Sequence, residues 1–217
     1  MIEIEGIDPF YQTLTLILAL LIAIIGHEIM HGYVAYRYGD FTAKNAGRLS
    51  INPLVHIDPI GSILVPGLLY ISGAPFLFGW AKPVPVDSYV VLKNGGYNAG
   101  IAVSLAGIAY NFALAILSVL LLGIVNTEEF FGAIVALFLL QLTLYNVVLG
   151  VFNLWPIPPL DGSRALAYGC LKYRFMSLPR LFGQLEPYGM IILVAILATP
   201  LSQWFFYPVR LILGFLL

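Results

Sequence analysis

The sequence predicts an all-α protein that crosses a membrane several times. Of its 217 residues, 60% are hydrophobic and 10% are charged, and the mean hydropathy is +0.94. Soluble domains are about 45–50% apolar and about 25% charged, so a soluble fold of this size could not bury so much apolar surface. The net charge of −1 excludes a basic surface for nucleic acid, and the single cysteine, Cys170, excludes an internal disulfide.

Three apolar runs are long enough to span a bilayer, which takes about 20 residues. They cover residues 13–36, 99–125 and 130–152 and are expected to form the core. Two further apolar runs follow at 187–199 and 201–217. Because Pro200 separates them, we expect one broken span or a helical hairpin, and so one or two C-terminal helices. No internal repeat divides the chain, and residues 1–217 are interpreted as a single integral-membrane domain.

The intervening segments carry most of the glycine, proline and charge. Residues 60–80 are apolar but repeatedly interrupted by Gly and Pro. Residues 81–98 contain two prolines and the pair Gly95-Gly96, which predicts short extended segments and turns. A proline-rich stretch covers residues 153–162. A basic loop is expected after it, with its positive charges at Arg164, Lys172, Arg174 and Arg180.

The first apolar run contains the string H-E-x-x-H, formed by His27, Glu28 and His31. On a helix, two histidines four residues apart lie on one face and can bind one Zn²⁺, while the intervening Glu is placed to activate water at the metal. Each ionisable group inside an apolar helix costs about 2.5–3.5 kcal/mol, which favours a functional role. The alternative is snorkelling or interhelical hydrogen bonding, which does not require metal spacing.

A helical zinc site of this kind needs a third protein ligand and an open position for water. The candidates are His56, Asp58, Asp87, Glu186 and Asp161. Asp161 is favoured because it closes the proline-rich stretch, and backbone carbonyls freed by proline are tolerated in membranes only inside protein or beside a cavity. The alternative is that Asp161 caps a helix that begins near Ser163.

Taken together, these motifs resemble the site-2 proteases. The resemblance is carried by H-E-x-x-H in an apolar helix and by N-x-x-P-x-P-x-L-D-G, here residues 153–162, near the end of a later span. Site-2 proteases are polytopic zinc metalloproteases that cut transmembrane helices of other proteins. Residues 52–61 and 79–86 look like the compact prokaryotic branch, which lacks a PDZ domain. The resemblance covers nearly the whole chain and implies regulated intramembrane proteolysis in a prokaryotic plasma membrane.

The resemblance also implies a role for each matching residue. His27, His31 and Asp161 would bind one Zn²⁺ per chain, and Glu28 would be the general base. These assignments agree with the chemistry that the spacing of the motif favours.

A third family element, A-G-P-x-x-N, reads A-G-I-A-Y-N here, with Ile108 in place of proline. That substitution makes the local helix geometry an open question. The resemblance leaves Asn111 near the scissile carbonyl, where its amide could donate a hydrogen bond to the oxyanion. The alternative role for Asn111 is interhelical hydrogen bonding.

The charge distribution predicts the topology. Acidic residues precede the first run and basic residues follow it, which favours an N-terminus outside and the next loop in the cytoplasm. For Asp161 to reach the histidines, residues 60–80 must dip into the membrane and return rather than cross it. This re-entrant course leaves Lys82 and Lys93 inside and the active site toward the cytoplasm. The resemblance implies extended backbone here, and residues 73–86 are the candidate edge for strand addition to a substrate, a flexible loop being the alternative.

Two other classes of function compete with a protease. A metal-ion transporter should carry ionisable groups along several spans, whereas residues 99–152 have none apart from the turn at Glu128 and Glu129. A zinc-binding scaffold would not need Glu28. We therefore expect a protease whose partners are a transmembrane-helix protein substrate and the lipid bilayer.

Overall fold

All regular structure in the part of the chain that the computed structural model describes, residues 7–73 and 79–217, is helical. The α-helices are α1 (Pro9–Arg37), α2 (Thr42–Asn45), α3 (Val65–Ile71), α4 (Ser88–Leu122), α5 (Phe130–Leu154), α6 (Asp161–Lys172), α7 (Ser177–Leu185), α8 (Gly189–Leu197), α9 (Leu201–Phe205) and α10 (Tyr207–Leu216). Short 3-10 segments cover Pro53–His56 and Glu186–Tyr188, and a π-helical segment covers Pro59–Leu64. The all-α prediction is confirmed.

Four helical stretches are long and apolar enough to cross a membrane: Pro9–Arg37, Ser88–Leu122, Phe130–Leu154 and Ser177–Leu197. The first three contain the expected core spans, and the fourth joins α7 to α8. On the outer face of α1, Ile17, Leu18 and Ile22 are exposed, as expected for a helix against lipid. The protein is therefore a multi-pass membrane protein.

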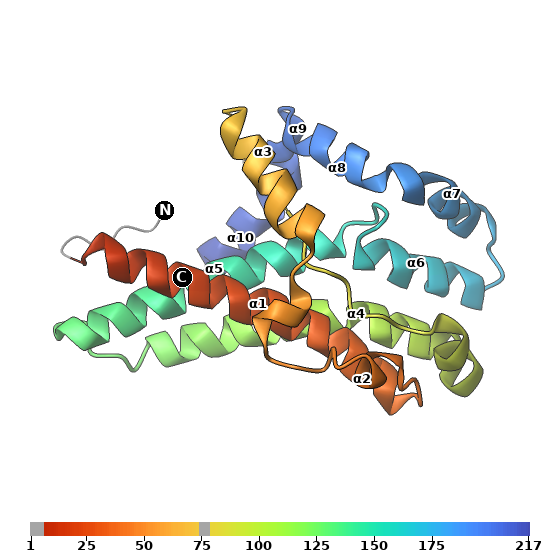
Figure 1. Cartoon of the computed structure of the whole chain (residues 1–217), viewed down its shortest axis with the longest axis horizontal. Helices are drawn as coiled ribbons and strands as arrows, with labels where there is room; N and C mark the ends of the chain where they lie inside the picture. Colours follow the sequence, from red (N-terminus) through yellow and green to blue (C-terminus); the bar gives the residue numbers. More distant parts are fainter. Residues whose placement is uncertain (1–6, 74–78) are drawn as a thin grey trace.

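Helices α1, α4 and α5 lie side by side as a bundle in which α4 runs antiparallel to the other two (Figure 1). Small and β-branched side chains let α1 and α4 approach closely: Ala35 packs with Ala99 and Val103 in one buried cluster. Helix α6 lies beyond the end of α5 and packs against α4. Residues of α1, α4, α5 and α6 therefore come together where α6 packs against the bundle.

Residues 88–98 were expected to form extended segments and turns, and this prediction is wrong. Helix α4 begins at Ser88 because the Asp87 carboxylate accepts hydrogen bonds from the backbone N–H groups of Tyr89 (2.9 Å) and Val90 (3.2 Å). The glycine pair instead marks a kink, since Gly96 has φ 63° and ψ −163°, a conformation that only glycine adopts easily. Residues 79–87 remain non-helical and contain no strand.

The basic loop expected after the proline-rich stretch is also corrected, because this region forms α6 and α7. Its charges did not exclude helices, since they lie on exposed faces: Arg164 and Lys172 are exposed, whereas Gly162, Ser163 and Ala165 are buried in α6. The charged residues that suggested a loop therefore belong to the exposed faces of these two helices.

The apolar helix from Pro59 to Ile71 is shorter than the four candidate spans. At about 1.5 Å per residue it is about 20 Å long, less than the roughly 30 Å hydrocarbon core. Its second half, α3, leaves the bundle at a steep angle (Figure 1). This length fits the re-entrant course, which stays a prediction. Of the candidate edge at residues 73–86, residues 74–78 lie outside the described part of the chain.

The C-terminal apolar region is divided around Pro200, as the sequence predicted. Helix α8 ends at Leu197, and α9 and α10 follow as separate short helices. Helix α10 packs against α5 through Val209, which is buried with Val147 and Val151. The C-terminal helices therefore support the bundle from the side of α5.

Candidate metal centre

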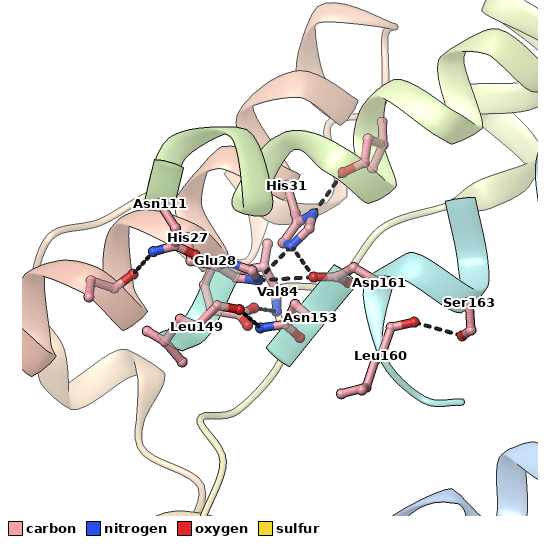
Figure 2. A network of polar contacts seen from close by, with 12 residues as sticks. His27, Glu28, His31, Val84, Asn111, Leu149, Asn153, Leu160, Asp161 and Ser163 are labelled. Atoms are coloured by element: carbon pink, nitrogen blue, oxygen red, sulfur yellow. Dashed lines mark hydrogen bonds and ion pairs between the residues drawn. The ribbon is translucent and has the colours of Figure 1, made fainter. Parts of the chain in front are cut away.

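Three side chains from α1 and α6 converge where the bundle meets α6 (Figure 2). The Nε2 atoms of His27 and His31 lie 3.0 Å apart, and Asp161 Oδ2 lies 3.0 Å from the first and 3.1 Å from the second. His27 and His31 are buried, and Asp161 is half-buried. This is the one group of potential metal ligands within residues 7–73 and 79–217.

The spacing of the three atoms fits a zinc ion. Zn²⁺ binds imidazole nitrogen and carboxylate oxygen at about 2.0–2.2 Å, which in a tetrahedron sets the ligand atoms about 3.3–3.6 Å apart. The three observed separations, 3.0–3.1 Å, are slightly shorter, so a small outward movement of the side chains would admit the ion. Two histidines and one carboxylate also match the donor set of zinc hydrolases, which leaves one position for water.

The other nitrogen of each histidine is fixed by an acceptor. His31 Nδ1 lies 2.7 Å from the Val103 carbonyl oxygen, and His27 Nδ1 lies 2.6 Å from Asn111 Oδ1. Because both acceptors need a proton, Nδ1 carries it in each ring, and each Nε2 can direct a lone pair at a metal. Both ligands come from α1, and both acceptors come from α4.

The environment of Asp161 keeps its carboxylate ionised. Burial alone would raise its pKa, but when both rings are also protonated at Nε2, the hydrogen bonds from His27 and His31 and the ring charges outweigh burial and lower the pKa well below the ordinary range. A zinc ion would take the place of those two Nε2 protons. Gly162 helps to position Asp161, because a Cβ there would overlap the Leu154 carbonyl oxygen. This close contact brings the first turn of α6 against the end of α5.

Glu28 lies beside the metal ligands but bonds elsewhere. Its Oε2 accepts a hydrogen bond of 2.8 Å from the backbone N–H of Val84, which belongs to the non-helical segment 79–87. Two contacts anchor that segment at Lys82, whose N–H donates to the His56 carbonyl (2.9 Å) and whose carbonyl accepts from Arg48 Nη2 (2.6 Å). The carboxylate of Glu28 is therefore held by main chain from outside the bundle.

The other candidates for a third ligand all bond away from this centre. Buried His56 contacts the Ser50 carbonyl through Nε2 (2.8 Å). Asp58 caps the π-helical segment, and Asp87 caps α4. Glu186 pairs with Arg164 at 3.6 Å. Asp161 does not act as the capping residue considered as its alternative, since its carboxylate contacts the two histidines.

The A-G-I-A-Y-N element lies in α4, directly against the metal ligands. A Cβ on Gly107 would lie 2.6 Å from His27 Nδ1 and from His31 Nε2, so this position requires glycine. Ile108 continues the regular helix and is buried, which answers the question about local geometry. The Nδ2 group of Asn111 donates to the Ala23 carbonyl (3.2 Å) and to Asn146 Oδ1 (2.8 Å). Both amide hydrogens are therefore engaged, which favours a positioning role over an oxyanion donor.

A cavity of about 940 Å³ opens beside the three ligands. Its lining includes His27, Glu28 and Asp161 together with Trp80, Val84 and other residues of the range 79–88. It extends to Arg164 and Glu186, whose side chains are both 57% exposed. Water can therefore reach the ligands from the surface where α6 meets the segment after α7.

Comparison with known proteins identifies the family. A Bacillus subtilis protein named "Putative zinc metalloprotease YwhC" is 36% identical over 199 residues, which cover 89% of this chain and 84% of YwhC. The chain belongs to this zinc metalloprotease family. Rip2 of Mycolicibacterium smegmatis, which has the same designation, is 33% identical over 188 residues, 83% of this chain and 65% of Rip2. MJ0611 of Methanocaldococcus jannaschii, likewise so designated, is 28% identical over 174 residues, 79% of this chain and 80% of MJ0611. No family model and no solved structure matches the chain.

The cofactor of this metalloprotease is zinc, as the relatives' names and the His27, His31 and Asp161 group indicate together. Sequence reasoning missed two contacts around the site. The N–H of Val84 carried no signal, because any residue except proline has one. Asn146 did carry a signal, since it is a polar residue inside an apolar span, and such residues are functional candidates by default.

Proposed function

We propose that this metalloprotease is a site-2 protease that hydrolyses peptide bonds of substrate transmembrane helices inside the membrane. The observation that carries the proposal is the place of the metal group on an apolar helix. His27 lies in the apolar helix Pro9–Arg37, ten residues before its end, or about 15 Å along the axis. A metalloprotease that acts in water would not need its ligands this far inside a helix that is apolar enough to span a membrane.

Within this proposal, His27, His31 and Asp161 hold one Zn²⁺, and Glu28 is the general base. When bound, zinc would polarise the scissile carbonyl and make water a stronger acid. Glu28 takes the proton of the attacking water and delivers it to the leaving amine. Its carboxylate adjoins the metal ligands, and its bond to Val84 orients it (Figure 2). The cavity that reaches Arg164 and Glu186 supplies the water.

The proposal includes the compact branch of the family, with residues 1–217 as one membrane domain in the plasma membrane of a prokaryote. The N-terminus would lie outside and the metal centre toward the cytoplasm, because the exposed cations Arg164, Lys172, Arg174 and Arg180 lie on α6, which begins at Asp161, and on the segment that follows it. The partners are the bilayer and a substrate whose helix unwinds locally before cleavage.

A reconstituted cleavage assay tests this function. Purified protein should contain one zinc per chain and cut a single-span substrate within its apolar segment, as located by mass spectrometry of the fragments. A chelator should stop the reaction, and added zinc should restore it. The matched control is a soluble protein that carries the same flanking sequence without the apolar segment, and it should stay intact. Cleavage of the soluble control alone would overturn the intramembrane assignment and leave a zinc protease.

A further inference from the structure

A chain of buried amides links three helices and ends on a metal ligand. Asn146 on α5 donates through Nδ2 to the Leu142 carbonyl (2.8 Å), and its Oδ1 accepts from Asn111 Nδ2 (2.8 Å). Asn111 on α4 faces His27 on α1 through Oδ1 (2.6 Å). Both asparagine side chains are fully buried, at 0% exposure. We propose that Asn146 is a positioning residue for the metal centre: through Asn111 it holds His27 with Nδ1 protonated and Nε2 open to zinc.

The direction of this chain is fixed by main-chain carbonyls, which can only accept hydrogen bonds. The Leu142 carbonyl takes a hydrogen of Asn146, so the oxygen of that amide must face Asn111. The Ala23 carbonyl takes the second hydrogen of Asn111, so only its oxygen is left for the imidazole of His27. His27 Nδ1 must then donate. If either amide were flipped, its oxygen would face another carbonyl oxygen and its NH₂ group would face another N–H donor, so hydrogen bonds would be lost at both ends.

The two histidines differ in how they reach this state. His31 Nδ1 faces the Val103 carbonyl directly, and a main-chain carbonyl in a helix cannot flip. His27 has a side-chain amide as its acceptor, and an amide rotates unless other bonds hold it. Ala23 and Asn146 are those bonds. Of the two histidines, therefore, only His27 depends on Asn146 to keep its proton on Nδ1.

The competing role for Asn146 is a plain interhelical hydrogen bond that holds α4 to α5. Both roles predict some loss of stability on substitution, so stability does not distinguish them. Zinc retention does, because the loss of a buried hydrogen bond elsewhere on α5 should leave the metal unaffected. Thr143 provides that comparison: it is 0% exposed on the same helix, and its hydroxyl donates to the Leu139 carbonyl within α5 (2.9 Å) without a link to the centre.

The inference rests on the proposed ligation of zinc by His27, and it is tested by zinc release rather than by activity. Wild type, Asn146→Leu, Asn111→Leu, the double variant and Thr143→Val are purified as full chains in detergent. Zinc loss to a chromogenic chelator is then followed over time. Partners of metal-bound histidines typically contribute about 10–100-fold to metal affinity. We expect about tenfold faster loss for Asn146→Leu, at least as much for Asn111→Leu, and wild-type behaviour for Thr143→Val.

The double variant separates a positioning role from a structural one. If Asn146 acts through Asn111, the double variant should release zinc no faster than Asn111→Leu, because the path is already broken. Additive effects, or a wild-type rate for Asn146→Leu, would overturn the proposal. Should Asn146→Leu not fold, Asn146→Ser takes its place, since its shorter side chain does not extend to the Asn111 amide. A wild-type protein without zinc would instead refute the proposed function.

Discussion

His27 and Glu28 are neighbours in the sequence, yet different parts of the molecule hold their side chains. His27 is fixed by Asn111 inside the bundle, through side chains that are fully buried between helices. Glu28 is fixed by the Val84 N–H, which belongs to a non-helical segment across the cavity. One half of the motif therefore depends on helix packing, and the other half depends on a loop.

The difference matches the separate tasks that we propose for the two side chains. Metal ligands must keep one geometry, and packed helices provide it. As the proposed general base, Glu28 would act beside an arriving substrate, and the segment 79–87 borders the cavity that we propose the substrate enters. Pro83 and Pro85 have no N–H, so Val84 supplies the one main-chain donor across residues 83–85. A hydrogen bond to a charged group contributes about 1.5–3 kcal/mol, enough to orient Glu28 without locking the segment.

The largest expected effect comes from removing one of the proposed metal ligands. Asp161→Ala should lose most of its zinc and all detectable cleavage, because two imidazoles alone make a poor zinc site. The bundle should still fold, since its apolar clusters do not include this residue. Zinc per protein on the purified variant is the measurement. Asp58→Ala is the control, and it should keep a full equivalent. Full zinc in Asp161→Ala would refute the ligand assignment.

On the other side, Glu28→Gln should keep zinc and lose cleavage. Glutamine retains an oxygen that can accept the Val84 N–H, but it cannot take up a proton. Removing a general base typically costs about 10²–10⁴ in rate. Cleavage of one single-span substrate and zinc content are measured on the same sample. A variant that loses zinc along with activity would make Glu28 part of the metal-binding half.

The loop contact itself can be removed by Val84→Pro, which eliminates the N–H that reaches Glu28. The expected loss of kcat is about 10–100-fold, the rate equivalent of one charge-assisted hydrogen bond. Zinc content should not change. Val84→Ala keeps the N–H and loses only side-chain packing, so it should retain far more activity than the proline variant. Equal losses in the two variants would mean that packing, and not the N–H, positions the base.

The smallest expected effect comes from single cysteine substitutions that test on which side of the membrane the segment 79–87 lies. Cysteines introduced one at a time at Lys82 and Lys93, in a Cys170→Ser background, should be labelled from the cytoplasmic face only. Both positions are exposed, as is Glu128, where a cysteine should be labelled from the opposite face. Labelling of Lys82→Cys from outside would show that residues 60–80 cross the bilayer, and the loop would then need another route to Glu28.

The sequence predicted the parts of this protein that follow from local pattern. Long apolar runs predicted the three core helices, because a span must satisfy its backbone internally. The spacing of His27 and His31 predicted a shared helix face. Predictions failed where charged residues and glycines were taken as signs of loops and turns: α6 and α7 were expected to be a basic loop, although their positive charges lie on the exposed faces of helices. Likewise, Gly96 kinks α4 where turns were expected.

By itself, then, the sequence determined the all-α membrane fold and proposed the metal group, since hydropathy and residue spacing act within one helix. Only the tertiary structure decided which partner each site residue meets. Asn111 faces His27, Val84 faces Glu28, and Asp161 joins histidines 134 and 130 residues earlier in the chain. Those contacts depend on how α1, α4, α5 and α6 pack and on the path of segment 79–87. Hydrogen bonds act over about 3 Å, and no local pattern fixes separate segments so closely.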